Sequence, residues 1–115
     1  MWASKMIKVV IKRDLSGSIK GMSINGHSGY AEEGQDIICS AVAATAYTAA
    51  GALEELAGLR GCYSEDDGHM DISLQPGMTP QQKATAGIVL ETTAIGFKQI
   101  ELSYGKYVLV IEEEV

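Results

Sequence analysis

The sequence predicts an α/β (α+β) fold, a small mixed sheet with two helices in the order β-β-α-β-α-β. Two observations lead to this prediction. Short β-branched or alternating runs recur along the chain, and two longer stretches repeat apolar residues at helical spacing. The chain has 115 residues, of which 46% are hydrophobic and 21% are charged. This size and balance fit one globular domain over residues 1–115.

The first two strands are expected at residues 6–13 and 18–25. Residues 6–13 read MIKVVIKR and are mostly β-branched or apolar. Residues 14–17, DLSG, are typical of a turn, so the second strand should run antiparallel to the first. Residues 26–36 carry three glycines and are expected to form a loop, and residues 1–5 fall outside the first strand pattern.

A long helix is expected to start at Asp36 and to end at Gly58 or Gly61. Its apolar residues recur at spacings of three and four, which marks a buried face made of Ile38, Val42, Ala46, Ala49, Leu53 and Leu56. The next stretch, residues 62–68, reads CYSEDDG and is expected to be an exposed acidic loop. Residues 69–75 alternate in polarity and predict a third strand.

The second helix has a clear start signal at residues 79–82, TPQQ. Threonine can cap the helix, proline suits the first helical position, and the last glutamine can complete a capping box. This helix is expected to stop at Gly96. Residues 102–111 should then form the last strand, followed by a solvated tail at residues 112–114.

The charge balance excludes several classes of partner. The formal net charge is −6 and the isoelectric point is about 4.8, whereas nucleic-acid binders usually carry a basic face. We expect no apolar run near the roughly 18 residues of a membrane helix. The first residues also lack the apolar core of a signal peptide. We therefore expect a cytoplasmic protein with no direct nucleic-acid or membrane contact, whose cysteines stay reduced.

His27 and Cys39 are the candidates for chemistry. In a helix that starts at Asp36, Cys39 lies in the first turn, where unpaired amides and the helix dipole stabilise a thiolate. A neutral His27 imidazole, twelve residues earlier, can take the thiol proton if the loop brings it within reach. The alternative is that Cys39 is a small core residue and His27 a polar strand end.

The residues next to Cys39 have supporting roles in the catalytic interpretation. Asp36 is expected to cap the helix, with orientation of the imidazole as the alternative. The amides of Cys39 and Ser40 are candidates for an oxyanion hole, and the Gln35 side chain is a weaker candidate. In the alternative interpretation, water satisfies these amides and Gln35 is an ordinary loop residue.

The loop between the two candidates holds the expected substrate contacts, Ser28, Gly29, Tyr30 and Gly34. Its glycines, with Gly26 before it, are either hinges or turn residues with positive φ. We expect no metal and no cofactor, because Cys62 and His69 add no CxxC, HxxxH or HExxH spacing to the chain.

Gly26-His27 and the run GQDIICSAVAA at residues 34–44 resemble the ribosomal-processing cysteine protease family, Prp. The resemblance implies a bacterial homodimer that removes the N-terminal extension of a large-subunit ribosomal protein, cutting after an aromatic-rich stretch. It also implies that His27 and Cys39 form the catalytic dyad. Many members carry a serine four residues after the cysteine, and this chain has Ala43 there. The difference removes any hydroxyl contribution from that helical turn and does not affect the dyad.

The predicted function is a cysteine endopeptidase. Cys39 would attack the scissile carbonyl, His27 would act as base and then as acid, and residues 28–35 would order around an extended substrate. Two alternatives stay open. One is a ribosome-associated binding module without catalysis, which clasps a basic tail. The other is a thioesterase or acyltransferase that uses the same thiol.

Overall fold

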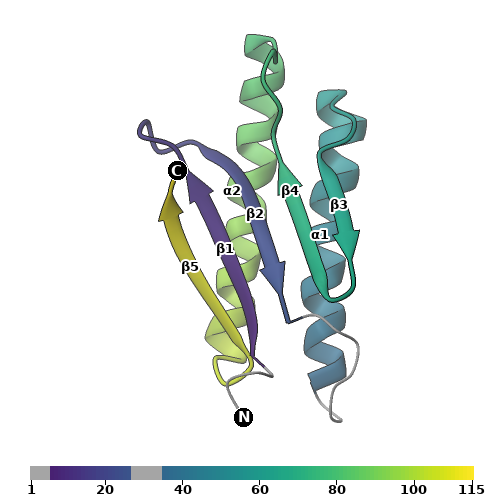
Figure 1. Cartoon of the computed structure of the whole chain (residues 1–115), viewed down its shortest axis with the longest axis vertical. Coiled ribbons are helices and arrows are strands. Elements are labelled where there is room, and N and C mark those ends of the chain that lie inside the picture. Colours follow the sequence, from purple (N-terminus) through teal and green to yellow (C-terminus); the bar gives the residue numbers. More distant parts are fainter. Residues whose placement is uncertain (1–5, 27–34) are drawn as a thin grey trace.

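The computed structural model describes residues 6–26 and 35–115, with side chains described from residue 37 onward in the second range. Its elements are β1 (Ile7–Arg13), β2 (Ile19–Asn25), α1 (Gln35–Ala57), β3 (Tyr63–Asp66), β4 (His69–Ser73), α2 (Pro80–Ser103) and β5 (Val108–Glu114). The strands form one sheet in the order β3-β4-β2-β1-β5, and both helices lie on one of its faces (Figure 1). The predicted mixed sheet with two helices is confirmed, with one strand more than expected.

The central strand β1 pairs antiparallel with β2, as predicted, and parallel with β5. Side chains alternate across a strand, so Ile7, Val9 and Ile11 all point toward the helices and are fully buried. Lys8 and Lys12 lie on the opposite, open face. The face toward the helices is thus wholly apolar, whereas the opposite face carries both lysines and the buried Val10.

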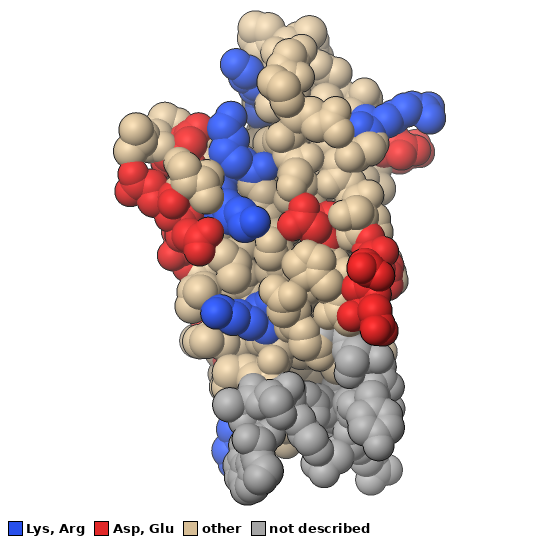
Figure 2. Space-filling view, in the orientation of Figure 1, with Lys and Arg blue, Asp and Glu red and all other residues tan. Residues whose placement is uncertain are grey.

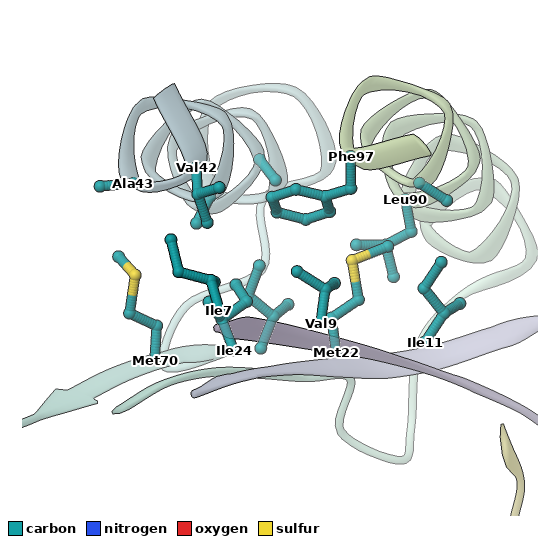
Figure 3. Packing of buried hydrophobic residues seen from close by; sticks show 14 of the residues in the cluster. Ile7, Val9, Ile11, Met22, Ile24, Val42, Ala43, Met70, Leu90 and Phe97 are labelled. Atoms are coloured by element: carbon teal, nitrogen blue, oxygen red, sulfur yellow. The ribbon is translucent and has the colours of Figure 1, made fainter. Parts of the chain in front are cut away.

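The core lies between this sheet and the two helices. Val42 from α1 and Leu90 and Phe97 from α2 point down onto the sheet residues (Figure 3). The sheet contributes the other side of the cluster with Ile7, Val9, Ile11, Met22, Ile24, Met70 and Ile72, all nearly or fully buried. Of the helix positions predicted to be buried, Leu56 is wrong, because it is 70% exposed and Ala57 is buried in its place.

The acidic stretch at residues 62–68 is not a loop. Residues 63–66 form β3, which pairs antiparallel with β4 around a tight turn at Asp67-Gly68. Gly68 has a φ of +81°, which glycine adopts without the steric cost that a side chain would bring. The strand lies at the edge of the sheet with most of its side chains in solvent, so its sequence shows no apolar alternation.

The second helix begins as predicted and ends later. The Thr79 capping box with Gln82 is confirmed. Gly96 does not stop the helix, which continues to Ser103, because this glycine lies where α2 approaches α1. A Cβ at Gly96 would be 3.4 Å from Cγ2 of Thr45. The predicted last strand is present with different bounds, because β5 spans Val108–Glu114. Residues 102–103 belong to α2, and residues 112–114 extend the strand instead of forming a tail.

Within α1, the segment Ile37–Ala57 is long and apolar enough to cross a membrane by length and composition alone, with a mean hydropathy of 1.4. The expectation that no run approaches that length does not hold for this segment. Its buried residues include Val42, Ala46 and Leu53, which pack on the sheet as the core face of a helix does.

Candidate active site

Cys39 lies near the start of α1 and is 4% exposed. It belongs to the buried cluster together with Ile38 and Ala43. Both cysteines of the chain are reduced. Burial of the thiol therefore agrees with the core interpretation, and its place at the end of a helix agrees with the catalytic one.

The start of α1 differs from the expectation by two residues, since a helix capped by Asp36 would begin at Ile37. The helix begins at Gln35, so Asp36 is its second residue rather than the residue before it, and Cys39 is its fifth. In an α-helix the N–H of residue i bonds to the C=O of residue i−4, so the Cys39 amide is used within the helix. The amides without intrahelical partners are those of the first turn, at residues 35–37, ahead of the thiol.

Several predicted site residues lie outside the described residues. They are His27, Ser28, Gly29, Tyr30 and Gly34, and the side chains of Gln35 and Asp36 join them. The structure describes both ends of this segment, which are the exit from β2 at Asn25 and Gly26 and the start of α1.

Gly26 fixes the exit from β2. Its φ is +91°, a conformation that side chains rarely adopt. A Cβ at this position would lie 2.7 Å from the carbonyl oxygen of Met6, at the start of β1. Only glycine lets the chain pass so close to that backbone, so the residue before His27 has a defined place in the fold.

His69 on β4 holds the same end of β2 through a hydrogen bond. The register pairs Asn25 on β2 with His69 on β4, and His69 Nδ1 donates to Asn25 Oδ1 across 2.6 Å. A carboxamide oxygen only accepts, so the imidazole carries a proton on Nδ1. The sequence assigns no role to either residue, because their contact depends on the pairing of β2 with β4. No local signal predicts that pairing.

One side of α1 faces the β3–β4 hairpin. Cys39, Ala43 and Tyr47 follow one another at spacings of four and so share a side of the helix. Tyr47 and Tyr63 both donate to Oε1 of Glu65 on β3, across 3.0 and 2.8 Å. Their rings meet edge to face with centroids 5.9 Å apart. The hairpin is thereby attached to α1 about 12 Å along the helix from Cys39.

On the open face of the sheet, basic and acidic side chains lie on different strands. Figure 2 shows basic side chains in the middle of this face and acidic side chains on both sides. The basic residues of β1 here are Lys8 and Lys12, whereas residues 65–67 of the hairpin are all acidic and exposed. The edge of the sheet that contacts Tyr47 of α1 therefore carries negative charge.

Cys62 occupies a different environment from Cys39. It is buried just before β3, and burial raises the pKa of its thiol. A raised pKa keeps this thiol protonated and poorly nucleophilic. Within residues 6–26 and 35–115, no three His, Cys, Asp or Glu side chains are grouped so as to hold a metal ion.

Comparison with known proteins decides the family. A family model described as cysteine protease Prp matches residues 6–109. The chain belongs to the Prp family of cysteine proteases. The resemblance stated from residues 26–27 and 34–44 is confirmed, and the chain is a cysteine protease rather than a member of another thiol-dependent class.

A Prp relative and two solved structures show how far the similarity extends. The ribosomal processing cysteine protease Prp of Bacillus subtilis (strain 168) is 29% identical over 101 residues, covering 86% of this chain and 90% of the relative. SMU.848 from Streptococcus mutans superposes with a TM-score of 0.86 at 24% identity, covering 100% of both chains. An essential ribosomal processing protease Prp from S. aureus, in complex with a substrate peptide, gives a TM-score of 0.81 at 24% identity. That match covers 94% of this chain and 100% of the S. aureus chain.

Proposed function

We propose that this single-domain chain is a ribosomal processing endopeptidase. It removes the N-terminal extension of a large-subunit ribosomal protein with a dyad of Cys39 and His27. The observation that carries the proposal is the Prp family match over residues 6–109, which includes both dyad residues. The B. subtilis relative, named for ribosomal processing, supports the substrate class.

In this proposal the Cys39 thiol loses its proton to the His27 imidazole, and the thiolate attacks the scissile carbonyl carbon. His27 then returns the proton to the leaving amine, which leaves the extension bound to Cys39 as a thioester. Water, activated by the same imidazole, hydrolyses the thioester. The S. aureus Prp structure with a covalently linked product peptide supports a covalent route in the family.

The start of α1 supplies the proposed electrostatic support. Developing negative charge on the scissile oxygen needs donors that are not already used. The first-turn amides at residues 35–37 meet this requirement better than the amides of Cys39 and Ser40, which the helix occupies. Gln35, Asp36 and Ser40 are proposed as supporting residues of this helix end, with Asp36 either stabilising the first turn or orienting His27.

The proposed substrate binds as an extended segment. Its contacts are assigned to Ser28, Gly29, Tyr30 and Gly34, and Gly26 holds the start of that loop in place. The acidic residues 65–67 beside α1 favour a basic stretch of substrate, as does the net charge of −6. The remaining assignments are a cytoplasmic location, a homodimer, and no direct contact with nucleic acid or membrane.

The test is cleavage of a peptide that spans the junction between the extension and the mature ribosomal protein, followed by mass spectrometry. The wild-type chain should give two products. Cys39→Ala and His27→Ala should give neither while keeping the wild-type circular dichroism spectrum. Cys62→Ala is the matched control and should cleave normally. Products from Cys39→Ala would refute the dyad, and peptide capture without cleavage by the wild type would indicate a binding module.

A further inference from the structure

A small cavity lies between α1 and β3, on the side of α1 that carries Cys39. It has a volume of about 270 Å³, and Ala50, Gly51 and Glu54 form its wall on the helix. Cys39, Ala50 and Glu54 are spaced eleven and then four residues apart, which places them along one side of α1. The cavity and the proposed nucleophile therefore share this side of the helix.

Gly51 keeps the cavity open. A Cβ added at this glycine would meet no other part of the chain within 4 Å, so the space above the helix backbone is empty there. Leu59 and Tyr63 also line the cavity, and both are partly buried against the core. The Tyr63 hydroxyl donates to Glu65, and its ring packs edge to face on Tyr47. The tyrosine wall is therefore held in place by contacts within the chain.

The cavity is closed near the end of α1. Residues 58–62 connect α1 to β3 there (Figure 1), and Gly61 and Cys62 of this connection line the cavity. Gln75 Nε2 donates to the carbonyl oxygen of Gly61 across 3.1 Å, and the Ser73 N–H donates to that of Cys62 across 2.8 Å. An extended chain that enters from the start of α1 cannot continue straight past this connection.

Two carboxylates give the cavity a negative charge. Glu54 and Glu55 both line it and are exposed. Within the part of the chain that the structure describes, neither forms an ion pair, although Arg60 follows in the connection to β3. A basic side chain can place its aliphatic stem on Leu59 and Tyr63 and reach the carboxylates with its charged end. The lining is therefore complementary to lysine or arginine.

We propose that this cavity, called the remote subsite below, binds a lysine or arginine side chain of the N-terminal extension, about five or six residues before the scissile bond. An extended peptide advances about 3.3 Å per residue, and Cys39 is about 16–18 Å along the helix from Ala50 and Gly51. The inference rests on the proposed function and names one of its substrate contacts.

The shape of the remote subsite selects the part of the substrate that it binds. The extension ends freely, whereas the mature side continues into the ribosomal protein, so a cavity with a closed end suits the extension. A volume of about 270 Å³ is below that of most sites for whole small molecules, which suits a single side chain.

The first experiment measures peptide binding by the full chain, with cleavage abolished by Cys39→Ala. Fluorescence anisotropy gives the Kd of junction peptides that carry one lysine, placed in turn at each position from three to eight residues before the junction. The Kd should be lowest with the lysine at five or six residues. Adding Gly51→Leu, which fills the remote subsite, should raise that lowest Kd at least about fivefold, because the aliphatic stem of the lysine loses its apolar contacts.

Gly87→Leu is the matched control for Gly51→Leu. Gly87 is also a helical glycine, and an added Cβ there likewise meets nothing within 4 Å. This variant should leave the Kd unchanged, and both variants should keep the wild-type circular dichroism spectrum. A Kd that does not depend on the position of the lysine, or equal effects of the two leucines, overturns the remote subsite. Tightest binding with the lysine on the mature side overturns its assignment to the extension.

The second experiment isolates the charge by replacing the lysine of the best peptide with norleucine, which lacks only the ammonium group. The lysine peptide should bind about two- to fivefold more tightly at low salt, as expected for an exposed ion pair. This preference should fall as salt is added and should be lost when Glu54→Gln and Glu55→Gln are combined. A preference that the double variant retains overturns the role of the carboxylates. Junction-peptide cleavage is measured separately with Cys39 intact, so failure of the remote subsite and failure of the protease assignment are distinguishable.

Discussion

The His69 imidazole on β4 donates to the Asn25 carboxamide on β2, with 2.6 Å between Nδ1 and Oδ1. Asn25 is followed by Gly26 and then by His27, so the bond lies two residues from the proposed catalytic base. At the same end of β2, Gly26 lies close to the backbone of Met6, which precedes β1. The proposed base His27 therefore follows directly on an end of β2 that is in contact with both β4 and the start of β1.

Replacing His69 should therefore reduce turnover more than stability. We expect His69→Ala to lower kcat on the junction peptide by about two- to tenfold, which corresponds to one lost hydrogen bond. His69→Gln, which can still donate to Asn25, should recover most of the loss. Ser23→Ala removes the 3.0 Å bond to Asp71 on the same strands and should leave kcat unchanged. Equal kcat in His69→Ala and wild type would exclude a positioning role.

Gly26→Ala should damage both fold and activity, and the chain offers a matched control. Gly17 has the same φ of +91° as Gly26, but an added Cβ there meets nothing within 4 Å. Gly17→Ala should cost about 1 kcal/mol of stability from backbone strain alone. Gly26→Ala should cost a further 1–3 kcal/mol or so, because the Met6 carbonyl must move. Urea unfolding measures both, and equal losses would show that the close approach is unimportant.

The ion-pair cluster around Arg13 should make stability depend on pH. The hydrogen bond from Arg13 lowers the pKa of Glu91, and hydrogen bonds from Lys98 and then Arg13 lower that of Glu112. A carboxylate with a lowered folded-state pKa adds stability above its ordinary pKa of 4.5, and this is lost as pH falls through the lower value.

Arg13→Gln should accordingly destabilise the chain at neutral pH by about 1 kcal/mol or less, since the cluster is well exposed to solvent screening. The difference between wild type and variant should shrink as pH falls below about 4.5, down to the part that comes from the Arg13 hydrogen bond to the Gly17 carbonyl. Urea unfolding at neutral pH and at several acidic values measures it. A difference that stays constant with pH would show that the loss comes from packing of the arginine stem.

The two thiols should differ in reactivity. Burial raises the pKa of Cys62, so a Cys39→Ala variant, which keeps only Cys62, should react slowly with iodoacetamide near neutral pH. Its rate should rise about tenfold per pH unit, in proportion to the thiolate fraction. The Cys62→Ala variant, which keeps Cys39, should react faster at neutral pH if the dyad is correct. Equal rates in the two variants would count against an activated Cys39.

The strands and helices with a local signal are predictable from this sequence. The β-branched, apolar run of β1 and the Thr79 capping box each depend on residues within a short stretch, and both predictions are confirmed. Strand β3 is not predictable in that way, because an edge strand with acidic, exposed side chains has the composition of a loop. The helix end predicted at Gly96 is wrong for a similar reason, because the glycine lies close to Thr45 of the other helix.

The same distinction between local and long-range signals applies to the candidate site. Cys39 near a helix start and Gly26 at a strand exit follow from local sequence, and their places in the fold agree with those expectations to within one turn. The contact between Asn25 and His69 requires the register of β2 on β4, two strands separated by the whole of α1. Local sequence therefore does not predict it. The dyad geometry stays a prediction, because His27 lies outside the described residues.

The pairing of β1 with β5 has a consequence for how the protein is made. Ile7 pairs with Val108, 101 positions later in the chain, so the central strand gains its second neighbour only after residues 108–114 exist. Contacts this distant in sequence close slowly, because a long loop must be closed before they form. β1 therefore keeps one edge open until residues 108–114 pair with it. Completion of the sheet is accordingly a late step of folding, after the β1–β2 hairpin that places Met6 against Gly26.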